Sequence, residues 1–401
     1  MSPWTTEFGN YVSWVPSERS EGGASWGLGK DAEDVAIVTL HDGDYVPQRI
    51  LDAPKLSEVV DHTELGASFD IKRDWGASLV SNHLAAALGT GGFHRVEVSR
   101  LVMDFNRFPG STPKSATHLD KLAISGYLAR DLDYVDKRWI LDTLYDGVSG
   151  EMDSVISAKQ LVVSIHTYDE RNSTDTQRPE VSILGRSHSY QRDSRLPFGL
   201  FDPIFPDILA ESAVRGALRD RIALTFEKAG VFVEHNYPYC LPDGSLEIRC
   251  QPWFFFHRLR RHYELSHPES ANDPAHKLVW RMLQNTNLRC AEANALSGYL
   301  HHFRDPLPGR RDDFERSRLS YEAIKEHLML HEPLVQAYRF AQDRTSALTI
   351  EVRKDLIWRF DSNGRPLGPR EDAAREIANL LAQGIATYMR EDRRACPVRL
   401  G

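Results

Sequence analysis

The sequence predicts an α/β fold in which helices flank a mixed, mostly parallel twisted sheet. Short apolar, β-branched segments alternate with segments in which apolar residues recur at helical spacing. Several strand candidates are apolar on both faces, which is typical of strands buried inside a helix-covered sheet. The predicted strands are residues 35–40, 97–105, 161–165, 181–184, 231–235 and 347–352.

Two helices are predicted by the spacing of their apolar residues. In residues 206–230, apolar residues recur every fourth position from Val214 to Phe226, and Gly230 supplies a stop. Residues 370–391 carry a similar apolar face. These helices are expected to cover the sheet.

The chain divides into three kinds of segment. Residues 1–30 are rich in Gly, Ser and aromatic residues and are predicted to form an irregular N-terminal arm, followed by a single α/β domain over residues 31–401. Residues 251–345 lack a strand pattern and are predicted to be a helical insertion within that domain. The insertion is expected to pack on the sheet; the alternatives are a lid over a site or the surface of a homodimer.

Composition excludes several classes of protein. The chain has 401 residues, of which 41% are hydrophobic and 26% charged, so it is long enough for a deep core. Its net charge of −8 argues against a nucleic-acid-binding protein. It contains no apolar run of membrane-spanning length and no signal-peptide pattern. Its four cysteines have no metal-finger spacing, and a cytoplasmic protein is expected.

Polar residues that could bind a metal follow two predicted strands. His41 and Asp44 lie in the loop after residues 35–40, where Gly43 permits a tight curl, and His166 ends the apolar run LVVSI. Ligands bind at the carboxyl edge of such sheets, and two histidines with one carboxylate are a common catalytic zinc set. The alternatives are an exposed turn at His41 and a capped core histidine at His166.

Three further positions indicate substrate binding and proton transfer. Asn106 and Arg107 follow the predicted strand 97–105, and arginine binds carboxylates through two parallel hydrogen bonds. Glu351 lies in an otherwise apolar strand, where a carboxylate that moves protons is one explanation for its burial. The alternatives are salt bridges of Arg107 with Asp104 and of Glu351 with Arg353.

The segment NYPY supplies two tyrosines, Tyr237 and Tyr239. A tyrosine hydroxyl could donate a hydrogen bond to a tetrahedral oxyanion. Packing in a proline-containing turn is the alternative for both residues. Tyr239 is the one that we assign to substrate binding.

These segments together resemble the N-formylglutamate amidohydrolase family, a branch of the zinc-carboxypeptidase-like superfamily. The resemblance is carried mainly by VTLHDGDYVP, VSRLVMDFNRFPG, VVSIHTYDE and ALTIEVRKDLIW. It implies a zinc-dependent hydrolase that cleaves an amide beside a free carboxylate, in an N-formyl or N-acyl amino acid or a small peptide. His41 and His166 would be metal ligands, Arg107 with Asn106 would bind the carboxylate, and Glu351 would be the general base.

Departures from the family pattern leave alternatives open. The first motif is His-Asp-Gly-Asp, whereas relatives usually show His-Ser-Gly. Asp44 matches the His-x-x-Glu spacing of the wider zinc carboxypeptidases, with Asp for Glu, and is taken as the third ligand. Asp74, in RDWG, is the competing carboxylate. The helical insertion favours a hydrolase of a specialised peptide or metabolite as one alternative, and the altered motif allows a non-catalytic binding protein as another.

Overall fold

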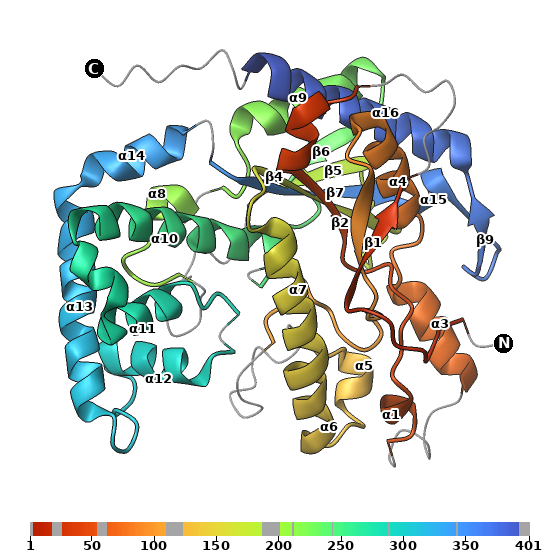
Figure 1. Cartoon of the computed structure of the whole chain (residues 1–401). Coiled ribbons are helices and arrows are strands. Elements are labelled where there is room, and N and C mark those ends of the chain that lie inside the picture. The colour runs from red at the N-terminus through yellow and green to blue at the C-terminus, as the bar shows by residue number, and fades with distance from the viewer. Residues whose placement is uncertain are drawn as a thin grey trace.

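A seven-stranded mixed sheet lies at the centre of the protein and has helices on both faces, which confirms the predicted fold class (Figure 1). The computed structural model describes residues 3–17, 26–53, 62–109, 123–186, 201–210, 212–242, 244–287, 289–341 and 344–392. The strands are β1 (Val12–Pro16), β2 (Val35–Thr39), β3 (Gly92–Val96), β4 (Leu161–Tyr168), β5 (Val181–Leu184), β6 (Val233–His235) and β7 (Ser346–Arg353).

The strands are arranged in the order β1-β3-β2-β4-β7-β5-β6. Strands β3, β2, β4 and β7 are parallel to one another, whereas β1 and β5 run antiparallel to their neighbours β3 and β7. All eight residues of β4 and of β7 are buried, as expected for central strands covered on both faces. In this pairing His166 lies directly beside Glu351, so the sheet brings together two residues that are far apart in the sequence.

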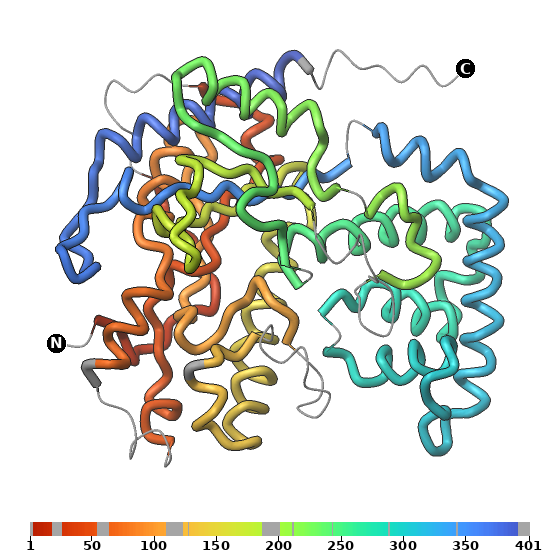
Figure 2. The backbone as a smooth tube through the Cα atoms, turned by 180° about the vertical axis from the view of Figure 1, so that it is seen from behind, coloured from red at the N-terminus to blue at the C-terminus, as the bar shows by residue number. Residues whose placement is uncertain are grey.

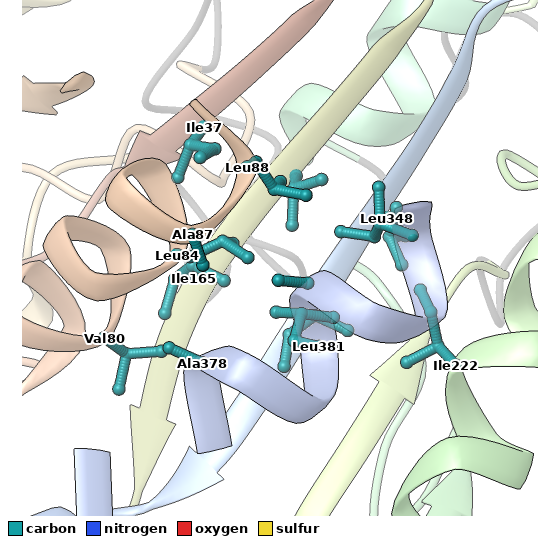
Figure 3. Close-up of a cluster of buried hydrophobic side chains, with 14 of the residues drawn as sticks. Ile37, Val80, Leu84, Ala87, Leu88, Ile165, Ile222, Leu348, Ala378 and Leu381 are labelled. Carbon is teal, nitrogen blue, oxygen red and sulfur yellow. The ribbon is translucent and has the colours of Figure 1, made fainter. Parts of the chain in front are cut away.

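One face of the sheet packs against α4 (Ala77–Leu88), α9 (Gly216–Lys228) and α16 (Glu371–Thr387). Figure 3 shows the side chains that meet there, including Leu84 from α4, Ile222 from α9 and Leu381 from α16 against Ile165 and Leu348 of the sheet. Because these helices use apolar residues at i, i+4 spacing, each buries one stripe against the strands. Helices α9 and α16 lie within the segments that were predicted to be helical.

The opposite face of the sheet carries a second hydrophobic core. Several helices contribute to it, among them the long α7 and the first turns of α10. The helices of this layer are α1 (Gln48–Leu51), α3 (His62–Lys72), α5 (Gly126–Ala129), α6 (Tyr134–Trp139), the π-helical turn η3 (Ile140–Tyr145) and α7 (Asp146–Ile156). His166 and Glu351 face this layer, because they alternate with the strand residues that belong to the first core.

In its described part, the segment predicted to be a helical insertion consists of helices joined by loops (Figures 1 and 2). These helices pack around a third hydrophobic core. Trp280, Phe256 and Phe314 are among its fully buried side chains. The helices are α10 (Leu246–Ser266), η5 (Pro268–Asn272), α11 (Pro274–Leu283), α12 (Ala291–Leu300), α13 (Arg311–Leu330) and α14 (Glu332–Phe340), with α8 (Asp207–Ala210) packed beside them. Helix α10 begins on the sheet and so links this core to β7.

The remaining elements are small and peripheral to the sheet. They are η1 (Gly29–Asp34), α15 (Lys354–Ile357), η6 (Tyr388–Asp392) and a hairpin of β8 (Trp358–Phe360) with β9 (Pro366–Pro369). None of the helices in the described segments combines the length and apolar character needed to cross a lipid bilayer.

Two local predictions differ from the structure. The predicted strand at 97–105 is wrong: β3 ends at Val96, and the chain then turns, because the backbone N–H groups of Val102 and Met103 both donate to the Ser99 carbonyl. The stretch predicted as an irregular arm contributes β1, which pairs with β3 at the sheet edge. Residues 1–2 and 18–25 of that stretch lie outside the described residues.

The packing in Figure 3 predicts the cost of a cavity in the first core. Leu381 is fully buried there, so Leu381→Ala should lower the free energy of unfolding by about 2–5 kcal/mol. Leu367→Ala, at a position that is 64% exposed, should change it by less than about 0.5 kcal/mol. Urea denaturation measures both, and equal losses in the two variants would contradict this account of the core.

Candidate metal centre

Three buried side chains converge where β2 and β4 end. His41 follows β2, Asp74 lies between α3 and α4, and His166 is the sixth residue of β4. Asp74 Oδ2 is 2.9 Å from His166 Nδ1 and 3.4 Å from His41 Nδ1, and one potential ligand atom of each residue lies within 4.8 Å of the others. At most 3% of each residue is exposed. Two imidazoles and a carboxylate at this spacing could hold a metal ion.

The loop after β2 is held in place by close backbone packing at Gly43 and by hydrogen bonds to the Asp42 carboxylate. A Cβ atom on Gly43 would lie 2.3 Å from the carbonyl oxygens of Val96 and Glu97, so only glycine allows this close approach. The neighbouring Asp42 carboxylate accepts hydrogen bonds from Arg73 Nε at 2.7 Å and from the Ser78 backbone N–H at 2.9 Å. These contacts fix the loop against the start of α4, and with it the position of His41.

A hydrogen bond to Asp104 orients the imidazole of His41. His41 Nε2 lies 2.8 Å from Asp104 Oδ1, whereas the buried Nδ1 atom makes no hydrogen bond within the described residues. If Nε2 carries the proton, Nδ1 of the neutral ring presents its lone pair towards Asp74. A carboxylate behind a histidine is the usual support of a metal-binding imidazole. The residues present therefore fit a metal ion.

The carboxylates of Asp74 and of the neighbouring Asp104 are both held in their ionised form. Burial alone would raise the pKa of Asp74, but the hydrogen bond to His166 and the neighbouring His41 outweigh it and hold that pKa far below the ordinary value. The pKa of Asp104 is lowered in the same way by His41 and by the guanidinium of Arg100. Arg100 reaches both carboxylates, at 3.4 Å and 3.2 Å. The cluster thus keeps negative charge that a cation could neutralise.

His166 is expected to be protonated near neutral pH when no metal is bound. Burial alone would lower its pKa, but the hydrogen bond to Asp74 and the charges of Asp74 and Glu351 raise the pKa to about 8. A metal ion that binds a histidine must displace the proton from the bonded nitrogen.

The carboxylate that lies beside both histidines belongs to Asp74, whereas the sequence analysis took Asp44 as the third ligand. The Asp44 side chain is 34% exposed and lies 4.0 Å from Arg73 Nη1, and it is not part of the three-residue cluster. The local His-x-x-Asp spacing favoured Asp44, but in the structure its carboxylate lies on the side of Arg73. Asp74 meets both histidines from the α3–α4 connection.

Glu351 lies beside His166 on the neighbouring strand and is 7% exposed. Burial and the Asp74 charge raise its pKa above the ordinary value, although His166 opposes the shift. The hydroxyl of Tyr239 donates a hydrogen bond of 2.5 Å to Glu351 Oε1. Desolvation and the nearby Glu351 charge raise the pKa of Tyr239 well above its ordinary value, so the phenol remains a donor. Glu351 makes no salt bridge with Arg353, which pairs with Asp355.

Arg107 and Asn106 lie at the rim of this cluster in different roles. Arg107 Nε is 3.3 Å from Asp104 Oδ2, and its side chain is 34% exposed. The Asp104 pairing that the sequence left open is therefore present, but it uses one edge of the guanidinium. Asn106 is buried, and its Oδ1 accepts the backbone N–H of Leu246 at 2.9 Å. Asn106 thus holds the start of α10, and only its Nδ2 atom remains for a substrate.

Arg100 and Asp104 belong to the site, although the sequence analysis gave Arg100 no role and considered Asp104 only as a partner of Arg107. Both lie in the SRLVMDFNR run, which the pattern predicted to be a strand. A signal was present, because three charged residues in so apolar a run are costly to bury unless they pair. They pair with each other and with His41.

Solved structures similar to this chain include the following two. No protein-family model matches the chain, and no curated protein matches it. A gene product from Agrobacterium tumefaciens is 16% identical, with a TM-score of 0.45 over 95% of each chain. The N-formylglutamate amidohydrolase from Ralstonia eutropha is 12% identical, with a TM-score of 0.47 over 95% of this chain and 99% of the other. Because both scores are below 0.5, the function proposed below rests on the geometry of the site itself.

The placement of the two aspartates predicts which one supports metal binding. Asp74→Asn should weaken zinc binding to the metal-free protein by about a hundredfold or more, because the amide removes both the negative charge and an anionic ligand oxygen. Asp44→Asn is the matched control and should bind zinc as the wild type does. Isothermal titration calorimetry measures both affinities. A loss confined to Asp44→Asn would contradict the placement.

Proposed function

We propose that this chain is a zinc-dependent amidohydrolase that cleaves an amide bond beside a free carboxylate. The observation that carries the proposal is the buried cluster of His41, Asp74 and His166 with Glu351 next to it on β7. The substrates that suit it are small N-formyl or N-acyl amino acids, followed by small peptides. The donor set of two imidazoles and one carboxylate favours zinc among the common metals.

In this proposal His41, Asp74 and His166 hold the zinc ion. When bound, zinc supplies a Lewis acid that polarises the amide carbonyl and makes water a better nucleophile near neutral pH. Asp104 keeps the lone pair of His41 Nδ1 directed at the site through its hydrogen bond to Nε2. Asp74 and Asp104 stay ionised, which compensates the charge of the cation.

Glu351 is the proposed general base. Tyr239 occupies Oε1, so Oε2 is the oxygen that would take a proton from water and later give it to the leaving nitrogen. A carboxyl group whose pKa is raised by burial accepts and returns a proton more readily near neutral pH than an exposed one does. Tyr239 positions this carboxylate and, because it remains protonated, can also donate to the developing oxyanion.

Arg107 is the proposed anchor for the substrate carboxylate. A third of its side chain is exposed, and only Nε contacts Asp104 among the described residues. The nitrogens at the other edge can form parallel hydrogen bonds to a carboxylate. Asn106 would add a single donor through Nδ2. This anchor favours amides of amino acids over neutral amides.

The second candidate is a binding protein that recognises a carboxylate ligand without cleaving it. The His-Asp-Gly-Asp motif and the Arg107 side chain are the observations that favour it. The helical insertion favours a third outcome, hydrolysis of a specialised peptide or metabolite. A panel of N-formyl amino acids, N-acetyl amino acids and dipeptides, assayed with and without added zinc, separates the three.

The role of Glu351 predicts the result of a conservative substitution. Glu351→Gln should lower kcat by about 10²–10⁴-fold, because the amide cannot take a proton from water. Its zinc content should match that of the wild type, since Glu351 is outside the proposed ligand set. Steady-state kinetics and metal analysis of the same samples check both points. Undiminished turnover would remove Glu351 as the base, and ligand binding without turnover in the wild type would favour the binding protein.

The role of Arg107 predicts a selective loss of substrate affinity. Arg107→Met should raise KM for a carboxylate substrate by about ten- to a hundredfold and change kcat much less, because a charge-assisted interaction made throughout the reaction is lost. The matching substrate with a carboxamide in place of the carboxylate is the control, and its already weaker KM should hardly change. An equal rise for both substrates would show that Arg107 acts through the fold.

A further inference from the structure

Glu247, on the first turn of α10, is a fully buried carboxylate that the proposed mechanism does not use. Its Oε1 accepts a hydrogen bond of 2.8 Å from Thr349 Oγ1, whereas its Oε2 has no hydrogen-bond partner within the described residues. An unpaired polar atom in the interior is costly, and a carboxylate oxygen more than most. The position of Glu247 therefore needs an explanation beyond its bond to Thr349.

Two more buried polar atoms that have no partner in the described part of the chain lie on the same face of the sheet. They are Ser164 Oγ and His166 Nε2, and both belong to β4. The strand register places Ser164 beside Thr349, to which Glu247 is bonded, and His166 is two residues further along the same face. Glu247 is also near enough for its charge to act on the imidazole of His166. The Glu247 carboxylate is thus an acceptor, and the Ser164 hydroxyl an intermediate group, on the same face of the sheet as the His166 Nε2 atom, which is the ring nitrogen not bonded to Asp74.

We infer that Glu247 is a positioning residue for His166. A chain of hydrogen bonds that includes the Ser164 hydroxyl runs from the Nε2–H group of the imidazole to the Glu247 carboxylate, which accepts the last of them. A buried water molecule would complete the relay wherever two of these groups do not touch directly. Without metal, Nδ1–H donates to Asp74; with the other proton held on Nε2, metal binding would displace the Nδ1 proton and leave the Nδ1 lone pair for the proposed metal. Glu247 then serves His166 as Asp104 serves His41, so each histidine has a buried carboxylate behind it.

This inference rests on the proposed metal centre, so zinc affinity is measured directly and without reference to turnover. Metal-free wild type and Glu247→Gln are titrated with zinc by calorimetry. Glutamine keeps the shape and an oxygen for Thr349, but its amide nitrogen cannot accept a proton from the relay. Binding should weaken about ten- to a hundredfold in Glu247→Gln, the usual cost of losing a carboxylate behind a metal ligand.

Asp202→Asn is the matched control for loss of a buried carboxylate. Asp202 is 7% exposed and accepts a 2.7 Å hydrogen bond from Tyr321 in the helical insertion. This variant should lose thermal stability and keep wild-type zinc affinity. Ser164→Ala provides a second route to the relay, with an expected fall in zinc affinity of severalfold, should Glu247→Gln fail to fold.

The position and exchange rate of the His166 ring proton provide a second measurement. Neither should change if Glu247 only stabilises the fold. In zinc-loaded wild type with ¹⁵N-labelled histidine, the His166 signal, assigned through His166→Gln, should show the proton on Nε2 with slow solvent exchange. Glu247→Gln should exchange that proton faster. A wild-type proton on Nδ1, or equal zinc affinity in wild type and Glu247→Gln, overturns the inference alone. Failure of the wild type to bind zinc overturns the metal centre and the inference together.

Discussion

The buried Asp74 carboxylate joins three separate parts of the chain. It bonds His166 in the middle of the sheet, faces His41 after the first parallel strand, and pairs with Arg100 beyond β3. Its backbone N–H also donates to the His41 carbonyl, so the contact includes the main chain. A charge buried this deeply is tolerated only with such partners, and removing any of them would leave the others unpaired. The geometry of the site follows from satisfying this one group.

The sheet supplies the second constraint. Because β4 and β7 are adjacent and parallel, His166 and Glu351 have fixed positions on one face, and the layer of helices on that face encloses them. The proposed base is therefore placed by strand register instead of by a loop, which is the more rigid way to hold a reacting group. Two residues earlier on the same strands, Ser164 and Thr349 lie side by side on the same face, and Glu247 of α10 accepts a hydrogen bond from Thr349 there.

The central strands were predictable because they are apolar on both faces. His41 and His166 were predictable as candidate site residues because each follows an apolar run, and Glu351 because it is a carboxylate within one. Which strands pair was not predictable, so the contact between His166 and Glu351 could not be inferred from local sequence. The choice of Asp44 over Asp74 followed the short spacing to His41. No pattern in that loop reveals the close packing of Gly43 or the approach of Asp74 to both histidines. The apolar, β-branched composition of residues 97–105 resembles that of a strand, although the chain turns there through hydrogen bonds to the Ser99 carbonyl.

The central claim is that His41, Asp74 and His166 bind one zinc ion. The most direct measurement is anomalous X-ray diffraction at the zinc absorption edge, on crystals of the protein loaded with one equivalent of zinc. The account predicts a single strong anomalous peak within bonding distance of all three side chains, about 2.0–2.2 Å from each ligand atom. A peak bound to Asp44 and not Asp74, or no peak between His41 and His166, would contradict it.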